Sequence, residues 1–167
     1  IKLGYELLGK EKLQQYFTDF GFAEKTGIDL PNEVGSSLLF DRDVEVATTS
    51  FGQGSVVTPI QQIQAFTAIA NEGEMMKPYV VSKITDSSGE VVEETEPTVA
   101  GTPISAETAK TVREYLETVI TDEKATGTAY AIEGYSVAGK TGTAQIAGTD
   151  GKYLTGASNY IFSFIGM

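Results

Sequence analysis

Two strand-like segments in the C-terminal part of the chain constrain the fold more than any other feature. They cover residues 135–147 and 159–166, and the polar stretch GTDGKYLTGAS joins them. The second segment, with the letters YIFSFIG, is the most apolar part of the sequence. A strand of this kind requires neighbouring strands at its edges and other elements on its faces. We therefore expect a sheet here, and we expect the chain to be a fragment of a longer domain.

Three segments further upstream show the apolar spacing of helices. The first ends at Gly21, a residue type that commonly stops helices. The second begins after Thr58, where Pro59 occupies the first helical position and Gln61 follows three residues after the cap. The third begins after Ser105, which is a favoured capping residue. The positions expected to face a core are Ile60, Ile63, Phe66, Ile69 and Ala70 in the second helix, and Ala109, Val112, Leu116, Val119 and Ile120 in the third.

A β-hairpin is predicted between the second and third helices. Residues 79–85 and 90–94 are rich in valine and flank the turn sequence DSSG. Residues 95–103 indicate a surface connection, and residues 126–130 a loop. Helices and hairpin strands in this order predict an α+β fold around a largely antiparallel sheet.

Composition excludes several kinds of site. The chain has 12 basic and 23 acidic residues, and the net charge of −11 argues against nucleic acid or anionic lipid as a partner. It contains neither Cys nor His, which rules out thiol nucleophiles, Cys/His zinc sites and a Ser-His-Asp triad. No apolar run reaches the roughly 18 residues that a membrane helix needs. We expect no metal and no cofactor.

The stretch AGKTGTAQ, residues 138–145, places one lysine and two glycines inside the first predicted strand. Glycine weakens a strand interior, so Gly139 and Gly142 indicate that something approaches the backbone closely. The letters from Gly134 to Thr141 fit a phosphate-binding loop, but such a loop opens a helix, and no helical pattern follows. The plainest alternative is a solvent-exposed lysine beside a turn.

A site for acyl transfer would account for the same residues through the chemistry of each side chain. A K-[ST]-G strand accompanies S-x-x-K and S-x-N elements in serine enzymes that attack D-alanyl peptides or β-lactams. On an edge strand, Lys140 supplies positive charge for a substrate carboxylate, and a threonine hydroxyl adds a neutral donor. Gly142 leaves space for the reacting carbonyl, and the N–H of Thr143 points at the developing oxyanion. Strand alternation places Lys140 and Gly142 on one face and Thr141 and Thr143 on the other. Gln145 either reaches the substrate or stays a solvated strand residue.

At these residues the sequence resembles the class B penicillin-binding proteins, transpeptidases that cross-link bacterial peptidoglycan. AGKTGTAQIA matches the family's K-[ST]-G-T-A-Q strand, and YLTGASNYIFSFIGM is similar to the strand that follows it. Residues 50–81 are similar to the stretch that joins the helical region to the sheet, and residues 20–35 to the segment after S-x-N. The similarity is greatest to division-type members of Gram-positive bacteria. It implies a serine β-lactamase/transpeptidase-like fold and a substrate-binding set of Lys140, Thr141, Gly142, Thr143 and Gln145.

Two elements of that family are missing from the sequence. S-x-x-K and S-x-N do not occur; the segments 121–124 and 149–152 have the spacing of the first element, but threonine stands where the serine should be. In the family both elements precede the region matched here, and a last strand and helix follow it. We therefore expect residues 1–167 to be the C-terminal part of the domain, without the nucleophile and inactive alone. Its expected partner is the missing N-terminal half or a swapped copy of itself.

The resemblance implies a function for the intact protein. A serine attacks a stem peptide ending in D-Ala-D-Ala, the terminal D-Ala leaves, and the acyl group passes to an amine of a neighbouring stem peptide; β-lactams bind at the same serine. A β-lactam-sensing receptor domain and a serine β-lactamase are the alternatives, because both share the K-T-G strand. The resemblance further implies a role in cell-wall synthesis and division at the extracytoplasmic face of the membrane, with an anchoring N-terminal helix outside this sequence.

Overall fold

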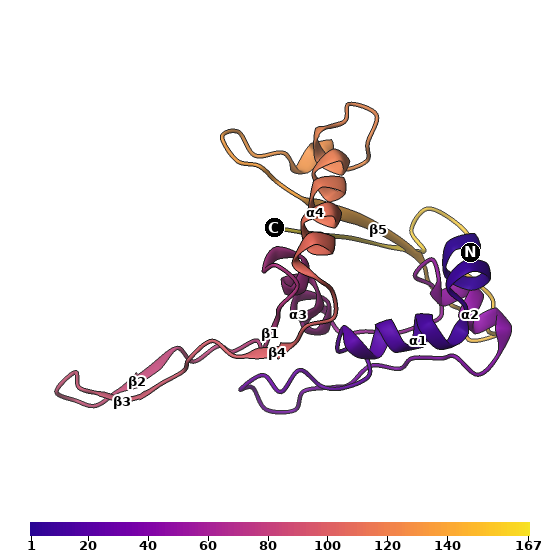
Figure 1. Ribbon diagram of the computed structural model, residues 1–167. Helices are drawn as coiled ribbons and strands as arrows, with labels where there is room; N and C mark the ends of the chain where they lie inside the picture. The colour runs from indigo at the N-terminus through magenta and orange to yellow at the C-terminus, as the bar shows by residue number, and fades with distance from the viewer.

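The computed structural model describes residues 1–167 and shows an α+β arrangement of short elements (Figure 1). The helical elements are η1 (Lys2–Leu8, a π-helix), α1 (Lys10–Asp19), α2 (Asp43–Thr49), α3 (Pro59–Ala70), α4 (Ala106–Thr121) and η2 (Thr128–Tyr130, a 3₁₀ turn). The strands are β1 (Met75–Met76), β2 (Lys83–Thr85), β3 (Val91–Glu94), β4 (Val99–Gly101), β5 (Gly139–Gln145) and β6 (Tyr160–Gly166). No helix has the length and apolar character that crossing a membrane requires.

The strands form three separate antiparallel pairs, β1–β4, β2–β3 and β5–β6. The α+β class and the antiparallel pairing are confirmed. The single sheet expected from the sequence is replaced by three separate two-stranded sheets. The longest pair is β5–β6, which runs in unbroken register from Gly139 opposite Gly166 to Gln145 opposite Tyr160. Beyond the strand, Ala138 and Met167 exchange both backbone hydrogen bonds at 3.0 and 2.9 Å. The pairing of the two C-terminal strands therefore continues past their formal ends.

The start of α3 is fixed by the cap that the sequence predicts. The Thr58 hydroxyl accepts a hydrogen bond from the Gln61 N–H at 3.3 Å, and the Gln61 Oε1 accepts one from the Thr58 N–H at 2.9 Å. The other side-chain atom of Gln61, Nε2, donates to the Glu24 carbonyl at 2.6 Å. Gln61 is completely buried. One side chain thus caps the helix and joins it to the loop that follows α1.

The prediction of which residues of α3 face the core is wrong in part. The buried residues are Gln61, Gln64, Ala65 and Ala68, whereas Ile63 is 52% exposed and Ala70 is exposed. The buried face packs against the loop after α1 and against β1, where small and amide side chains satisfy backbone groups; the Thr67 hydroxyl, for example, accepts from the Met76 N–H at 2.8 Å. The stripe expected on α4 is confirmed, since Ala109 and Ile120 are buried and the other three members are half-buried.

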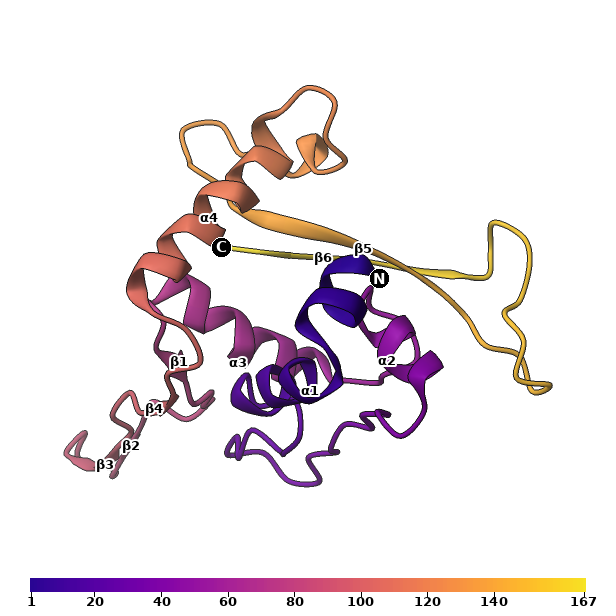
Figure 2. The ribbon, with the colours of Figure 1, turned by 45° about the vertical axis from the view of Figure 1, so that its right-hand side comes forward.

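The hairpin β2–β3 projects away from the helices and is exposed along its whole length (Figures 1 and 2). Its base is held by Asp29, whose carboxylate oxygens accept from the N–H groups of Val80 and Val81 at 2.7 and 2.8 Å. These bonds hold the pKa of Asp29 below its ordinary value, the Val81 N–H contributing most. They also explain why β2 begins at Lys83 and not at residue 79 as predicted: the amides of Val80 and Val81 bond to a carboxylate instead of a neighbouring strand.

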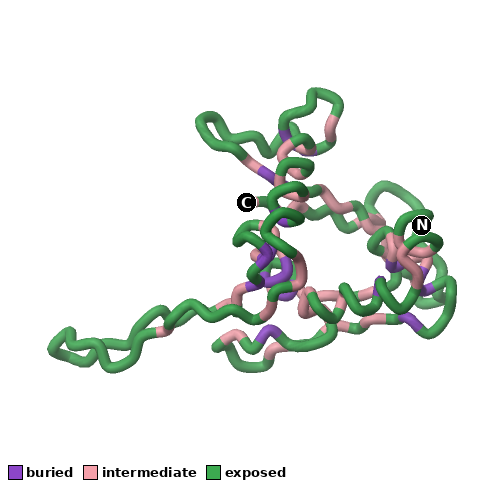
Figure 3. The backbone as a smooth tube through the Cα atoms, in the orientation of Figure 1, coloured by how far each residue is buried: buried purple, intermediate pink, exposed green.

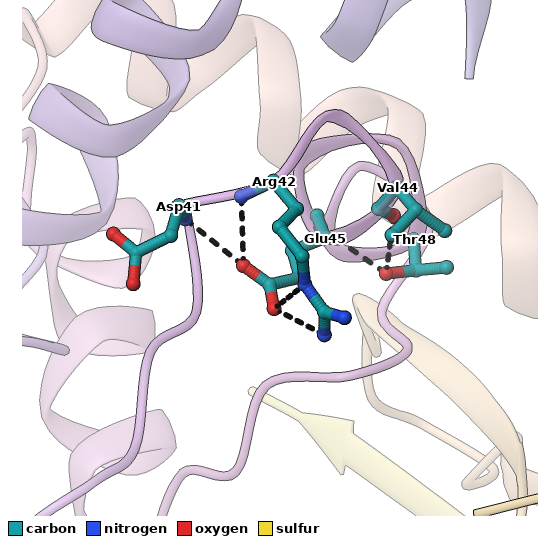
Figure 4. Close-up of polar contacts among 5 residues, drawn as sticks. All are labelled: Asp41, Arg42, Val44, Glu45 and Thr48. Atoms are coloured by element: carbon teal, nitrogen blue, oxygen red, sulfur yellow. Dashed lines mark hydrogen bonds and ion pairs between the residues drawn. The ribbon is translucent and has the colours of Figure 1, made fainter.

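The N-terminus of α2, an element that the sequence did not reveal, is organised by one carboxylate (Figure 4). Glu45 accepts from the N–H groups of Asp41 and Arg42 at 2.9 and 3.0 Å, and its other oxygen pairs with the Arg42 guanidinium at 2.6 Å. The backbone hydrogen bond from Arg42 is the main reason why the pKa of Glu45 is lowered. Val46, one turn into this helix, joins Leu13 and Phe40 in the small core that positions η1 and α1.

Burial in this arrangement is slight. Only 17 of the 167 residues are buried, and Figure 3 shows them as short separate stretches. The accessible surface is 11337 Å², whereas a folded monomer of 17.8 kDa exposes about 8,000 Å². Large apolar side chains are part of the excess, including Ile161 at 59% and Phe162 at 70% exposure on β6. The fold therefore leaves more apolar surface exposed than a folded monomer of this size usually does.

Candidate functional site

The K-T-G stretch lies on β5, which has β6 on one edge and no hydrogen-bonded strand on the other (Figure 2). Lys140 and Gly142 stand opposite Ile165 and Ser163, while Thr141 and Thr143 stand opposite Phe164 and Phe162. Because side chains alternate along a strand, the lysine and the second glycine share one face and the two threonines share the other. An unpaired edge of this kind can accept an extended peptide through main-chain hydrogen bonds.

The two glycines make room for side chains of the partner strand. A Cβ at Gly139 would overlap the Phe164 ring and lie 2.8 Å from the Ile165 carbonyl oxygen, and Gly139 is buried. A Cβ at Gly142 would overlap the Ser163 hydroxyl. The close approach that the sequence indicates is thus made by β6 itself. Only at Gly142 is the neighbour the end of a small, mobile side chain.

Lys140 carries an ammonium group without a carboxylate partner. Its side chain is exposed, and Nζ donates to the Thr141 carbonyl at 2.8 Å. The two ion pairs of the chain lie elsewhere, between Arg42 and Glu45 and between Lys110 and Glu114. This positive charge is therefore available to an anionic ligand in a chain that is otherwise strongly acidic.

A pocket of about 410 Å³ lies beside this part of β5. It is mostly apolar and is formed by three parts of the fold: the loop after α1, one side of α3, and the β5–β6 pair. The lining residues are Phe20, Phe22, Gln62, Ala65, Phe66, Ile69, Lys140, Thr141, Gly142, Ser163, Phe164 and Ile165. An apolar hollow with a few polar groups at one wall is the usual form of a small-molecule site.

The other predicted site residues differ in whether they line the pocket. The Thr141 hydroxyl lies 2.8 Å from the Thr126 hydroxyl, Thr143 is exposed, and Gln145 Nε2 donates to the Tyr160 hydroxyl at 3.4 Å. The structure thus brings Lys140, Thr141 and Gly142 to the pocket, whereas Thr143 and Gln145 lie further along the strand.

Sequence reasoning missed Thr126 and the aromatic side chains that line the pocket. The aromatic residues carry ordinary helix-and-loop patterns, and Thr126 is fifteen positions away from the residue that it contacts, so no local signal marks either group. Among the serines of the chain, Ser163 lines the pocket, but it lies against Gly142 without a hydrogen-bonded base. Among the residues that line the pocket, none is therefore an activated nucleophile.

Comparison with known proteins identifies the architecture. The family described as "Penicillin binding protein transpeptidase domain" matches residues 1–167. Stage V sporulation protein D of Bacillus subtilis is 47% identical over 171 residues, which are 99% of this chain and 25% of that protein. The probable peptidoglycan D,D-transpeptidase FtsI of Caulobacter vibrioides is 32% identical, over 84% of this chain and 23% of that protein.

A solved structure agrees with both relatives. Penicillin binding protein 3 of Mycobacterium tuberculosis, crystallised with ampicillin, superposes with a TM-score of 0.83 at 31% identity, covering 94% of this chain and 36% of that one. The chain belongs to the transpeptidase domains of the class B penicillin-binding proteins. It spans about a quarter of the length of these curated relatives.

Proposed function

We propose that this chain supplies the substrate-binding strand of a peptidoglycan transpeptidase. The observation that carries the proposal is the unpaired edge of β5, where the Lys140 ammonium, which has no carboxylate partner, stands beside an apolar pocket. The names of the relatives, which include a peptidoglycan D,D-transpeptidase, support this reaction. A penicillin-binding protein crystallised with ampicillin supports a β-lactam as an alternative ligand.

In this proposal the substrate is a stem peptide ending in D-Ala-D-Ala, bound as an extra strand along β5. Lys140 and the Thr141 and Thr143 hydroxyls bind its terminal carboxylate, and the Thr143 N–H stabilises the developing oxyanion. A serine from another part of the protein forms a bond to the penultimate carbonyl carbon, and the bond to the terminal D-Ala breaks. An amine of a second stem peptide then takes the acyl group and releases the serine. Gln145 extends the binding wall.

We infer further that residues 1–167 work as the C-terminal part of their domain. The large exposed surface, the absent S-x-x-K and S-x-N elements, and the match to a quarter of the relatives all support this. The missing part covers the apolar face, or a second copy does so by swapping. We place the intact protein at the extracytoplasmic face of the bacterial membrane, in cell-wall synthesis and division.

The test is acylation of the full-length protein by a fluorescent penicillin. Lys140→Ala removes a charge-assisted contact worth about 1.5–3 kcal/mol, so the second-order acylation rate is expected to fall roughly ten- to 150-fold. The matched control is Lys152→Ala, which removes an exposed lysine from the loop between β5 and β6 without touching the pocket. Melting temperatures of both variants report on folding.

A near-normal rate in Lys140→Ala, with Lys152→Ala also unchanged, would overturn the role assigned to β5. A comparable loss in both variants would show that charge in general, and not this ammonium, governs the reaction.

A further inference from the structure

The hydroxyl groups of Thr126 and Thr141 lie 2.8 Å apart, and this contact joins the candidate binding strand to a loop that no sequence motif marks. Thr126 follows α4, and Thr141 is the middle residue of the K-T-G stretch. The contact lies on the face of β5 opposite Lys140. Thr126 therefore contacts one member of the proposed substrate-binding set without belonging to that set.

The loop that presents Thr126 is fixed on both sides of that residue. On one side, the N–H of Ala125 donates to the Asp122 carbonyl at 2.9 Å. On the other, Gly127 is buried, its N–H donates to the Val119 carbonyl at 3.1 Å, and any Cβ there would lie 2.6 Å from that same oxygen. These contacts fix the backbone on both sides of Thr126, whose side chain is exposed and reaches the Thr141 hydroxyl.

A second contact ties this loop to the sheet. The ring of Tyr130 stacks on that of Phe164 with centroids 3.8 Å apart and planes 2° from parallel. Phe164 stands directly opposite Thr141 on β6, so the aromatic contact and the hydroxyl pair lie side by side on one face. The loop and the strand are thus held together at two adjacent points.

Which of the two hydroxyls donates the hydrogen bond decides how Thr141 can interact with a substrate. A threonine hydroxyl has one proton to donate and two lone pairs to accept with. If the Thr141 hydroxyl donates its proton to Thr126, only its lone pairs can face the substrate, and lone pairs repel a carboxylate. If Thr126 is the donor, the proton of Thr141 is free to point at the carboxylate.

We propose that Thr126 is a positioning residue, whose hydroxyl donates to that of Thr141 and so directs the single Thr141 proton toward the substrate carboxylate. This inference rests on the proposed function, because it needs an anionic ligand on β5. Thr126 itself touches neither the substrate nor the reacting atoms. Its effect passes entirely through Thr141.

The experiment measures acylation of the full-length protein by a fluorescent penicillin, whose carboxylate is the group addressed. Thr126→Val keeps the shape of the side chain and removes the hydroxyl, and Thr126→Ser keeps the hydroxyl. The loss of one neutral hydrogen bond is expected to slow acylation about three- to tenfold in Thr126→Val, while Thr126→Ser stays close to wild type.

A double-mutant cycle with Thr141→Val separates positioning from general structural support. If Thr126 acts through Thr141, the double variant is no slower than Thr141→Val alone; independent effects would multiply. A normal rate in Thr126→Val, a loss in Thr126→Ser equal to that in Thr126→Val, or multiplying losses would each overturn the inference. Should valine lower the melting temperature, the same cycle is run with Thr126→Ala, and the same outcomes apply.

Failure of this inference is distinguishable from failure of the proposed function. A wild-type protein that is not acylated, or a normal rate in Lys140→Ala, overturns the function and this inference with it. A slow Lys140→Ala variant together with a normal Thr126→Val variant overturns the positioning role alone.

Discussion

Replacing Gly139 by alanine tests the packing of β5 against β6 where the fold is tightest. The new Cβ would overlap the Phe164 ring and lie 2.8 Å from the Ile165 carbonyl oxygen, which belongs to the paired backbone and has little freedom to move. Overpacking of this kind costs about 1–3 kcal/mol. The lower chain entropy of alanine in the unfolded state returns about 0.4–1 kcal/mol. The midpoints of these two ranges give a net destabilisation of about 1.3 kcal/mol.

The assay is denaturant and thermal unfolding of the full-length protein, with Gly35→Ala as the matched control. Gly35 has its nearest neighbouring atom 4.0 Å from an added Cβ, so its substitution carries the entropic gain without the overlap. For a cooperative unit of 150–250 residues, each kcal/mol lowers the melting temperature by about 2–4 °C, and in a larger unit the shift shrinks in proportion.

Phe164→Leu removes the ring that the new Cβ meets. Gly139→Ala is expected to cost less in that background than in the wild type, although the overlap with the Ile165 oxygen remains. Equal stability of Gly139→Ala and wild type, or an equal cost in both backgrounds, would refute the reasoning.

Three further predictions concern the hairpin base, the exposed apolar surface and the missing nucleophile. Because hydrogen bonds lower the pKa of folded Asp29, their contribution to stability is complete above its ordinary value of about 3.9 and is lost as the pH falls through the folded pKa. Protection factors of the Val80 and Val81 amides, measured by hydrogen exchange, should therefore hold at pH 4 and fall below it; loss of protection well above pH 4 would contradict this. The 167-residue chain alone is expected to bind an apolar-surface dye and to sediment as an associated species, and to form no covalent adduct with penicillin. Intact-mass spectrometry checks the adduct, and a stoichiometric one on any serine would show that the chain contains its own nucleophile.

Elements whose signals are local were predictable from the sequence. The caps at Thr58 and Ser105 start α3 and α4 where expected, because a capping side chain bonds to amides two or three residues away. The two C-terminal strands pair as expected, since the apolar segment Tyr160–Gly166 needs a neighbouring strand and Gly139–Gln145 lies just before it in the chain. The strand that carries Lys140 was also predictable, because the residues of its motif are consecutive in the sequence.

Features that depend on distant residues were not predictable. The buried face of α3 was misjudged because Gln61 and Gln64 are buried, Gln61 with a hydrogen bond to the distant Glu24 carbonyl, while apolar periodicity alone favours Ile63. Helix α2 was missed because its N-terminus is organised by the Glu45 carboxylate and not by a serine or threonine cap. Thr126 joins the candidate site only once β5 lies beside the loop after α4.

The double use of Gln61 limits which sequences can specify this helix start. Isolated capping boxes treat glutamate and glutamine as equivalent, since either carboxyl or amide oxygen can accept from the cap residue. Here the second end of the side chain must also donate, to the Glu24 carbonyl, from a fully buried position. Glutamate has no proton to give and would place a negative charge against a carbonyl oxygen. A capping box by itself accepts glutamate or glutamine at this position. Here the contact with Glu24, thirty-seven residues away, leaves glutamine as the only one of the two that fits.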